Sequence, residues 1–510
     1  MKKVFKYLIY ILPAALYFSY FPLISFGKNE TMNFEISLSL IWLVLFDLAV
    51  AVLVVPQKTY WQMVKRFWLW LLFPAWLTLS LIWSLNPIRG LLTVGILWLI
   101  YFAVSGLYYL RNLFDSDFRA KFWKIFYCTT IIICIWCLVQ CLLDLAGIGR
   151  DYTLMCAGCT YRMFGFPHPN GFAIEPQFMG NLLLAPALTL AYFNIKDSNA
   201  SHLAKSARPA RVTKQLPQSS HAARKPPRFL PKLLLFVVLA TLFLTFSRGA
   251  IYAFVVAMVS MSAFFIAKEK KSARKPLVKT IGLVWGIIVI AFAFTLNLQG
   301  IMASVSPTTD TYRSGVAKVL NHLSLGIIDI DAPKQANSDA PKPTIDPTDS
   351  KSSASSSIEP QTTGSPEEAI FDGYVEESTN ARVYLTNSGI ASWQQSPSTI
   401  LFGVGLGGAG QALYQNGFIV APKEIVQNQY ASLLLESGLV GITLFILTLI
   451  LIIRIVLKTR SSIITFSLLL AYAITLCFFS GLVNALQIYL MPPVVAILAP
   501  RKSKLKIQNK

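Results

Sequence analysis

The chain has 510 residues, of which 55% are hydrophobic and only 14% are charged, and its mean hydropathy is +0.56. This composition excludes an ordinary water-soluble globular protein and indicates a polytopic membrane protein. The formal net charge of +21 requires no nucleic acid, because basic residues beside anionic lipid headgroups account for it, and the sequence contains no nucleic-acid-binding motif.

Apolar runs of roughly membrane-spanning length recur along the chain and predict its fold class. We predict an all-α, multi-pass protein with about twelve transmembrane helices. The first run has no small-residue cleavage site, so we interpret it as a span and not as a signal peptide. The predicted spans are residues 4–26, 36–55, 67–83, 91–110, 125–145, 177–195, 233–246, 250–267, 280–297, 438–457, 463–480 and 482–498.

The distribution of lysine and arginine predicts the orientation of these spans. If the N-terminus is cytosolic, 33 of the 45 basic residues fall on cytosolic connections and the other twelve lie on the opposite side. This is the bias that the positive-inside rule describes. Both termini are therefore predicted to be cytosolic.

The same topology divides the chain into four parts. Residues 1–297 hold nine spans and a basic cytosolic linker at 196–232, residues 298–426 form a large external loop, residues 427–500 hold three spans, and residues 501–510 are a basic tail. Within the loop, residues 331–368 are rich in Ser, Thr and Pro and are predicted to be disordered. The flanks at 311–328 and 378–395 have the apolar periodicity of amphipathic helices, and both could lie at the membrane surface as a lid.

A single arginine, Arg248, stands between two apolar runs in the sequence Thr245-Phe246-Ser247-Arg248-Gly249. Burying an arginine at the centre of a membrane helix costs about 2.5 to 3.5 kcal/mol, so an arginine that faces the bundle indicates function. The alternative is an arginine that reaches for lipid headgroups from a helix end.

The loop before the sixth span combines turn residues and aromatics with Arg162, His168 and Glu175. It is either the floor of a site or an ordinary surface loop punctuated by proline and glycine. Cys156 and Cys159, in the same external loop, could form a local disulfide. Cysteines of the fifth span share an apolar helical face without a nearby histidine, so we expect no metal site and no cofactor.

Gly403, Gly405 and Gly408 satisfy the spacing of a dinucleotide-binding motif. They follow a predicted helix instead of a strand, and they lie outside the cytosol on the predicted topology. We therefore interpret residues 402–410 as a tight turn at the membrane surface.

Three features together resemble one known family. They are the Arg248 turn, the glycine turn, and a pattern that runs from Gln427 through Asn428 to Gly438 and Gly441 after a large external loop. The chain resembles the O-antigen ligase and Wzy-type polymerase superfamily, in which His-Asn is followed by nine residues, Gly, two residues and Gly. The asparagine and both glycines match, whereas Gln427 occupies the position of the histidine.

The resemblance implies glycosyl transfer at the outer face of the bacterial cytoplasmic (inner) membrane. A glycan on undecaprenyl diphosphate would pass to a hydroxyl of a glycan, lipid or protein acceptor, with membrane lipids and no nucleic acid as further partners and with no metal. Arg248 and Arg382 are candidates to bind the diphosphate, because a guanidinium group forms bidentate hydrogen bonds to phosphate oxygens. Arg162, Asn428 and Ser247 are candidates for substrate binding.

The glutamine has a chemical consequence, because Gln427 can orient a hydroxyl but cannot deprotonate it. Glu175, Glu424 and His168 are the external residues that could act as base instead, and Glu175 comes first because burial would raise its pKa. A carboxylate that favours a helix N-terminus is the other interpretation of Glu175. The acceptor could also need little activation, or the protein could be inactive.

Two other functions stay open at this stage. The linker at 196–232 divides twelve spans into six and six, as in major-facilitator transporters, although that family's signature between the second and third spans is missing. A non-catalytic factor in surface-polysaccharide assembly is the third hypothesis, and it rests on Gln427.

Overall fold

The computed structural model describes residues 2–29, 32–146, 148, 162–163, 166–173, 175–206, 230–269, 271–305, 312–324, 374–422, 426–457, 461–478 and 485–499. Strands in these parts form only two small antiparallel hairpins, β1 (Pro22–Asn29) with β2 (Met32–Ser37) and β3 (Arg162–Met163) with β4 (Phe166–Pro167). The described chain is otherwise helical, which agrees with the predicted all-α class.

The helices follow one another in this order: α1 (Lys2–Tyr17), α2 (Leu38–Leu53), α3 (Lys58–Arg66), α4 (Leu72–Leu79), α5 (Pro87–Leu110), α6 (Ser116–Leu145), α7 (Pro176–Ser206), α8 (Leu230–Leu244), α9 (Arg248–Lys268), α10 (Lys271–Val305), α11 (Tyr312–Leu323), α12 (Tyr374–Trp393), α13 (Pro397–Phe402), α14 (Ala409–Gln415), α15 (Gln429–Leu457), α16 (Ser462–Thr475) and α17 (Leu486–Leu498). Two short 3-10 helices, Trp68–Leu71 and Ser80–Trp83, flank α4.

The predicted number of twelve spans is not confirmed. In the described residues, α5, α6, α7, α9, α10 and α15 contain segments long and apolar enough to cross a membrane, and a seventh is added if α2 and α3, bent by 116°, form one span. The segment Trp68–Trp83 and helices α8, α16 and α17 are apolar but shorter. A helix of 14 residues such as α16 is only about 21 Å long, against a hydrocarbon core of roughly 30 Å.

The first predicted span, residues 4–26, differs most from its expected form. The helix α1 ends at Tyr17, and the chain turns into β1 at Pro22. The apolar residues after Tyr17 therefore form part of a hairpin with β2 and not the end of a spanning helix.

The centre of the bundle is α7, because 83% of its apolar window is buried, whereas the window of α15 is only 17% buried. Small residues let other helices approach α7 closely, and Ala185, Ala187 and Ala191 are completely or almost completely buried. Helices α8, α9, α10 and α16 all pack against it. The N-terminal end of α7 therefore lies at the centre of one end of the bundle.

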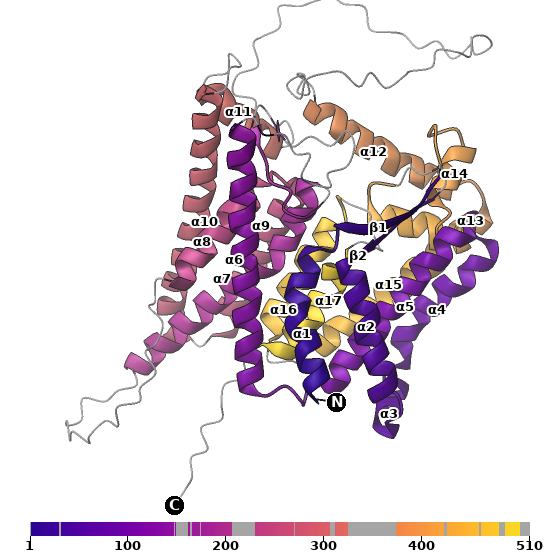
Figure 1. Ribbon diagram of the computed structural model, residues 1–510, viewed down its shortest axis with the longest axis horizontal. Coiled ribbons are helices and arrows are strands. Elements are labelled where there is room, and N and C mark those ends of the chain that lie inside the picture. Colours follow the sequence, from indigo (N-terminus) through magenta and orange to yellow (C-terminus); the bar gives the residue numbers. More distant parts are fainter. Residues whose placement is uncertain are drawn as a thin grey trace, which may run out of the picture.

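Figure 1 shows α11 and α12 at the end of the bundle opposite to the N-terminus. The external-loop flanks predicted as helices are confirmed as helices, and they pack mainly on α10 and on α15. The segment 331–368, the cysteines Cys156 and Cys159, and Glu424 lie outside the described residues.

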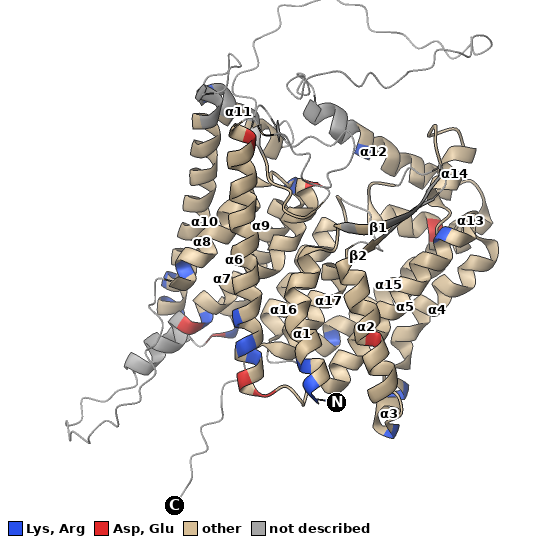
Figure 2. Cartoon of the chain, viewed as in Figure 1, with Lys and Arg blue, Asp and Glu red and all other residues tan. Residues whose placement is uncertain are grey.

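The outer surface of the bundle is apolar, with large side chains such as Ile132, Leu142, Val259 and Val289 more than half exposed. Exposure of this much hydrocarbon is unfavourable in water and suits a surrounding of lipid chains. Figure 2 shows that lysines and arginines of the described chain gather at the end where the N-terminus lies. That asymmetry has the direction that the positive-inside prediction requires.

The glycine turn is confirmed as a turn that follows a helix, α13. Gly403 and Gly405 have φ of 74° and 84°, and a Cβ on Gly403 would lie 2.4 Å from the carbonyl carbon of Glu436. On the other side, Gly438 breaks α15 with φ of 64° and a hypothetical Cβ 2.3 Å from the Leu401 oxygen. The glycines here allow two backbones to touch, which is a packing role.

Candidate functional site

The C-terminal end of α16 connects several of the predicted site residues. Asn428 donates from Nδ2 to the carbonyl oxygen of Cys477 at 3.1 Å, and Arg382 donates from Nη1 to the carbonyl oxygen of Phe478 at 3.2 Å. The other arm of the Arg382 guanidinium group donates to Oε1 of Gln177 at 3.1 Å. Arg382 of the loop helix α12 therefore joins the end of α16 to the start of the central helix α7.

The turn between α8 and α9 lies against the same end of α7. Ser247 caps α9 by accepting from the backbone N–H of Ala250 at 3.4 Å, and its hydroxyl donates to the carbonyl of Gln177 at 3.5 Å. Gly180 permits this approach, because a Cβ there would lie 2.8 Å from Cβ of Ser247. Arg248 is the first residue of α9, so it shares this end of the bundle with Arg382.

Phe246, within the same turn, has an uncommon backbone. In the described residues it is the only non-glycine with positive φ, at 48°. Such a conformation costs on the order of 1 to 3 kcal/mol and persists only where the surrounding structure enforces it. Its carbonyl oxygen lies 3.2 Å from Nε2 of His322 on α11, so the strained turn is tied to the external loop.

Asn428 has a structural role in addition to its predicted role in substrate binding. Its Oδ1 accepts from the backbone N–H groups of Tyr430 and Ala431 at 2.9 and 3.1 Å, which caps the first turn of α15. With Nδ2 bound to the Cys477 carbonyl, both ends of the amide are engaged within the protein. Asn428 thus fixes the half-buried Gln427, the preceding residue, beside the end of α16.

Glu175 lies just before α7, within electrostatic range of Arg382. Burial raises the pKa of Glu175, and the positive charge of Arg382 partly offsets that rise. The predicted effect of burial on this carboxyl group is therefore present, and Arg382 is its electrostatic partner.

The structure adds His322, which the sequence analysis did not name. Its side chain is 4% exposed, and burial together with the positive charges of Arg248 and then Arg382 lowers its pKa to about 3, despite the opposing bond to the Phe246 carbonyl. His168, also 4% exposed, lies within electrostatic range of the same ring. The imidazole is thus neutral at physiological pH.

A signal for His322 existed in the sequence. The chain has four histidines, and on the predicted topology only His168 and His322 are external. The apolar periodicity of the helix at 311–328 does not by itself single out His322. Backbone carbonyls such as those of Cys477 and Phe478 have no sequence signal at all.

Most of the predicted site residues therefore gather at one end of the bundle. Arg162 is placed only by its backbone, which pairs with Pro167 in the hairpin of β3 and β4. Within the described residues no group of three His, Cys, Asp or Glu side chains could hold a metal ion. The residues that gather are Glu175, Ser247, Arg248, Arg382, Gln427 and Asn428.

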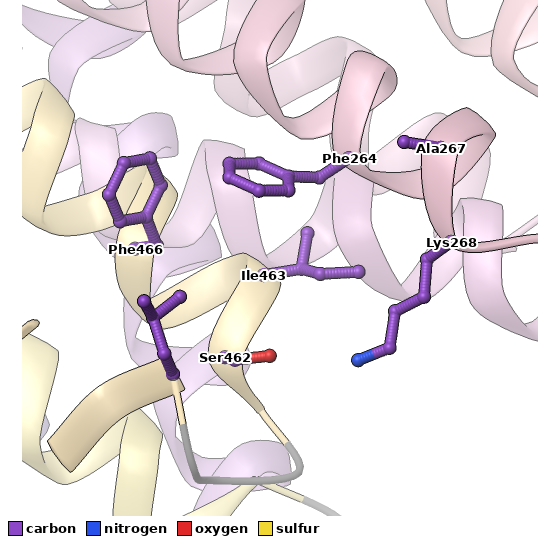
Figure 3. A pocket seen from close by; sticks show the side chains of 7 residues that line it. Phe264, Ala267, Lys268, Ser462, Ile463 and Phe466 are labelled. Carbon is purple, nitrogen blue, oxygen red and sulfur yellow. The ribbon is translucent and has the colours of Figure 1, made fainter. Parts of the chain in front are cut away.

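A pocket of about 330 Å³ lies elsewhere, where α9 and α15 end and α16 begins (Figure 3). Phe264 and Phe466 line it with the terminal Lys268 of α9. Because α9 has 21 residues, Lys268 is about 30 Å from Arg248 along the helix axis. This pocket cannot belong to the site at the arginine turn.

Comparison with known proteins bears on the middle of the chain. Residues 233–446 match the family model described as O-antigen ligase, and this range includes the arginine turn, α11, α12 and the start of α15. No curated protein and no solved structure matched the chain. This match supports the resemblance to the O-antigen ligase and Wzy-type polymerase superfamily over residues 233–446, and it supports a general role in lipid-linked glycan transfer.

Proposed function

We propose that the protein transfers a glycan from undecaprenyl diphosphate to an acceptor hydroxyl at the outer face of the cytoplasmic membrane. The observation that carries this proposal is that Arg382 donates to Oε1 of Gln177 at 3.1 Å, while Ser247, the residue before Arg248, donates to the carbonyl of the same glutamine at 3.5 Å. Two guanidinium groups therefore converge on one small region at the end of the bundle predicted to be external.

Diphosphate is the ligand class that fits this arrangement. Each guanidinium group can bind phosphate oxygens in a bidentate manner and stays charged at any physiological pH. Arg248 also stands in the first turn of α9, where the helix dipole favours an anion. When the glycosidic bond to the diphosphate breaks, negative charge develops on the leaving oxygen, and fixed cations stabilise that charge.

Other polar groups would either contact the acceptor substrate and the glycan or hold neighbouring groups in position. Gln427 would orient the acceptor hydroxyl, with Asn428 and Ser247 holding the two helix starts in position. Glu175 would hold Arg382 in place as its electrostatic partner, and Arg162 is a candidate for glycan contact. Whether the acceptor is a lipid, a growing glycan or a protein decides between ligase, polymerase and protein-glycosylating activity.

The proposal is tested by deleting the gene in its source strain and measuring two quantities. We expect the product glycan to disappear from gels and the lipid-linked glycan to accumulate in membrane extracts analysed by mass spectrometry. Separately, purified protein in lipid nanodiscs should bind undecaprenyl diphosphate, measured as a thermal shift. Unchanged lipid-linked glycan in the deletion strain would contradict the function, and a catabolic defect instead would favour the transporter alternative.

A further inference from the structure

The family position for histidine holds glutamine here, so a base that activates the acceptor in the proposed transfer would come from another residue. Three groups of the described chain lie within electrostatic range of this region and can be compared: Glu175, His168 and His322. Glu424 lies outside the described residues. Glu175 would carry a negative charge as a base beside Arg382, and a bound diphosphate would repel that charge.

His322 is anchored by a specific hydrogen bond. A carbonyl oxygen can only accept, so the contact at 3.2 Å between Phe246 O and Nε2 of His322 requires the proton on Nε2. The basic lone pair of the neutral ring is then on Nδ1. A carbonyl that fixes the tautomer of a histidine is the usual way in which proteins orient such a ring for proton transfer.

The end of α11 that carries His322 is tied to the arginine turn by a second contact. The hydroxyl of Tyr252, one helical turn after Arg248 on α9, donates to the backbone carbonyl of Leu323. Together with the bond to the carbonyl of Phe246, two residues before Arg248, this contact holds the end of α11 against the arginine turn. The strained φ of Phe246 belongs to the same arrangement, because it sets the direction of that carbonyl.

We propose that His322 is the base that removes the proton from the acceptor hydroxyl in this protein. The acceptor oxygen forms a bond to the anomeric carbon of the glycan, and the bond from that carbon to the diphosphate oxygen breaks. The electron pair leaves on the diphosphate, between Arg248 and Arg382. The hydroxyl proton moves to Nδ1 of His322 and is later released to water.

The surrounding charges couple this base to the donor. Burial and then the positive charges of Arg248 and Arg382 lower the pKa of His322 and keep its ring neutral. A bound diphosphate would compensate their positive charge, so the pKa of His322 would rise when the reaction requires a base. Glu175 near Arg382, Tyr252 near Arg248, and His168 are further titratable groups of this region in the described chain.

The inference rests on the proposed function, and the variant His322→Gln separates the two. Glutamine can still donate to the Phe246 carbonyl but cannot accept a proton, so a merely structural role predicts normal transfer. We expect transfer to fall by about 10²- to 10⁴-fold. Binding of undecaprenyl diphosphate in nanodiscs and the amount of membrane protein should stay at the wild-type level.

Asn321→Gln on the same helix is the matched control and should transfer normally. Wild-type transfer by His322→Gln would overturn the inference. If transfer is nevertheless lost in Arg248→Lys, the proposed function still stands. If His322→Gln is poorly expressed, His322→Asn, which also lacks a basic nitrogen, replaces it. Failure of the wild-type protein to bind undecaprenyl diphosphate would instead contradict the proposed function.

Discussion

The glycine turn at 402–410 and the arginine turn around Arg248 both carry recognisable sequence patterns, yet they differ in what surrounds them. The glycine turn meets backbone, since Gly403 and Gly438 lie where a Cβ would collide with the opposing main chain. The arginine turn meets side chains that can change charge or bind anions, among them His322 and Arg382. The small residues here serve packing, whereas the arginine turn belongs to the candidate site.

The comparison predicts that substitutions in the glycine turn reduce folding, whereas substitutions in the arginine turn reduce transfer. Gly438→Ala should have the largest effect, because it adds a Cβ 2.3 Å from the Leu401 oxygen at a φ of 64°. Folded protein in membranes, measured by gel-filtration fluorescence, should be lost. Gly417→Ala is the matched control, because Gly417 has a similar φ of 71° with no atom within 4 Å of the added Cβ. Equal losses in both would show that strain, and not the backbone contact, is responsible.

Arg382→Gln should reduce transfer by two orders of magnitude or more, by analogy with about 10²- to 10³-fold for the loss of one charge-stabilising donor. Folding should be retained, since the remaining amide can still bond to Gln177 or to the Phe478 carbonyl. The measurement is product glycan per unit of membrane protein. Arg454→Gln, at the other end of α15, serves as the control and should transfer normally. Normal transfer by Arg382→Gln would remove this residue from the site.

Gln427→His restores the family's histidine beside Asn428, the residue that caps α15. Transfer should be preserved or increased, and in the His322→Gln background it should be partly restored if both positions face the same hydroxyl. The assay is the complemented deletion strain. Abolished transfer in well-folded Gln427→His would mean that the site has adapted to glutamine.

The smallest expected effect concerns the contribution of Glu175, the residue before α7, to the stability of the fold. Burial raises the pKa of Glu175 above its ordinary 4.5, so the fold favours the neutral acid. The stabilisation from the neutral form is complete below the ordinary pKa and is lost as pH rises through the raised value. The glutamine of Glu175→Gln stays neutral at every pH. The melting temperature of this variant should therefore rise relative to that of the wild type as pH rises above 4.5. Parallel melting curves across this range would contradict the predicted titration.

The sequence allowed much of this architecture to be predicted, because periodicity and hydropathy depend on local residues. The helix at 378–395 and the turn at 402–410 were both accessible in this way. The hairpin of β1 and β2 was not, since the apolar run from residue 4 to 26 hides the end of α1 at Tyr17.

The site itself was only partly accessible. Individual residues such as Arg382 could be named from charge and position. Their convergence depends on carbonyls at the end of α16 and on the close approach that Gly180 allows, which are properties of the folded chain. His322 was missed because its importance arises from the Phe246 carbonyl, 76 residues earlier in the chain.

The central claim is that Arg248 binds the diphosphate of the donor, and Arg248→Lys tests it most directly. Lysine keeps the charge but loses the planar two-pronged contact, so transfer and binding of undecaprenyl diphosphate in nanodiscs should both fall by orders of magnitude at an unchanged amount of folded protein. An arginine that only reaches for lipid headgroups could be replaced by lysine without loss. Wild-type transfer and binding by a normally expressed Arg248→Lys protein would contradict the account.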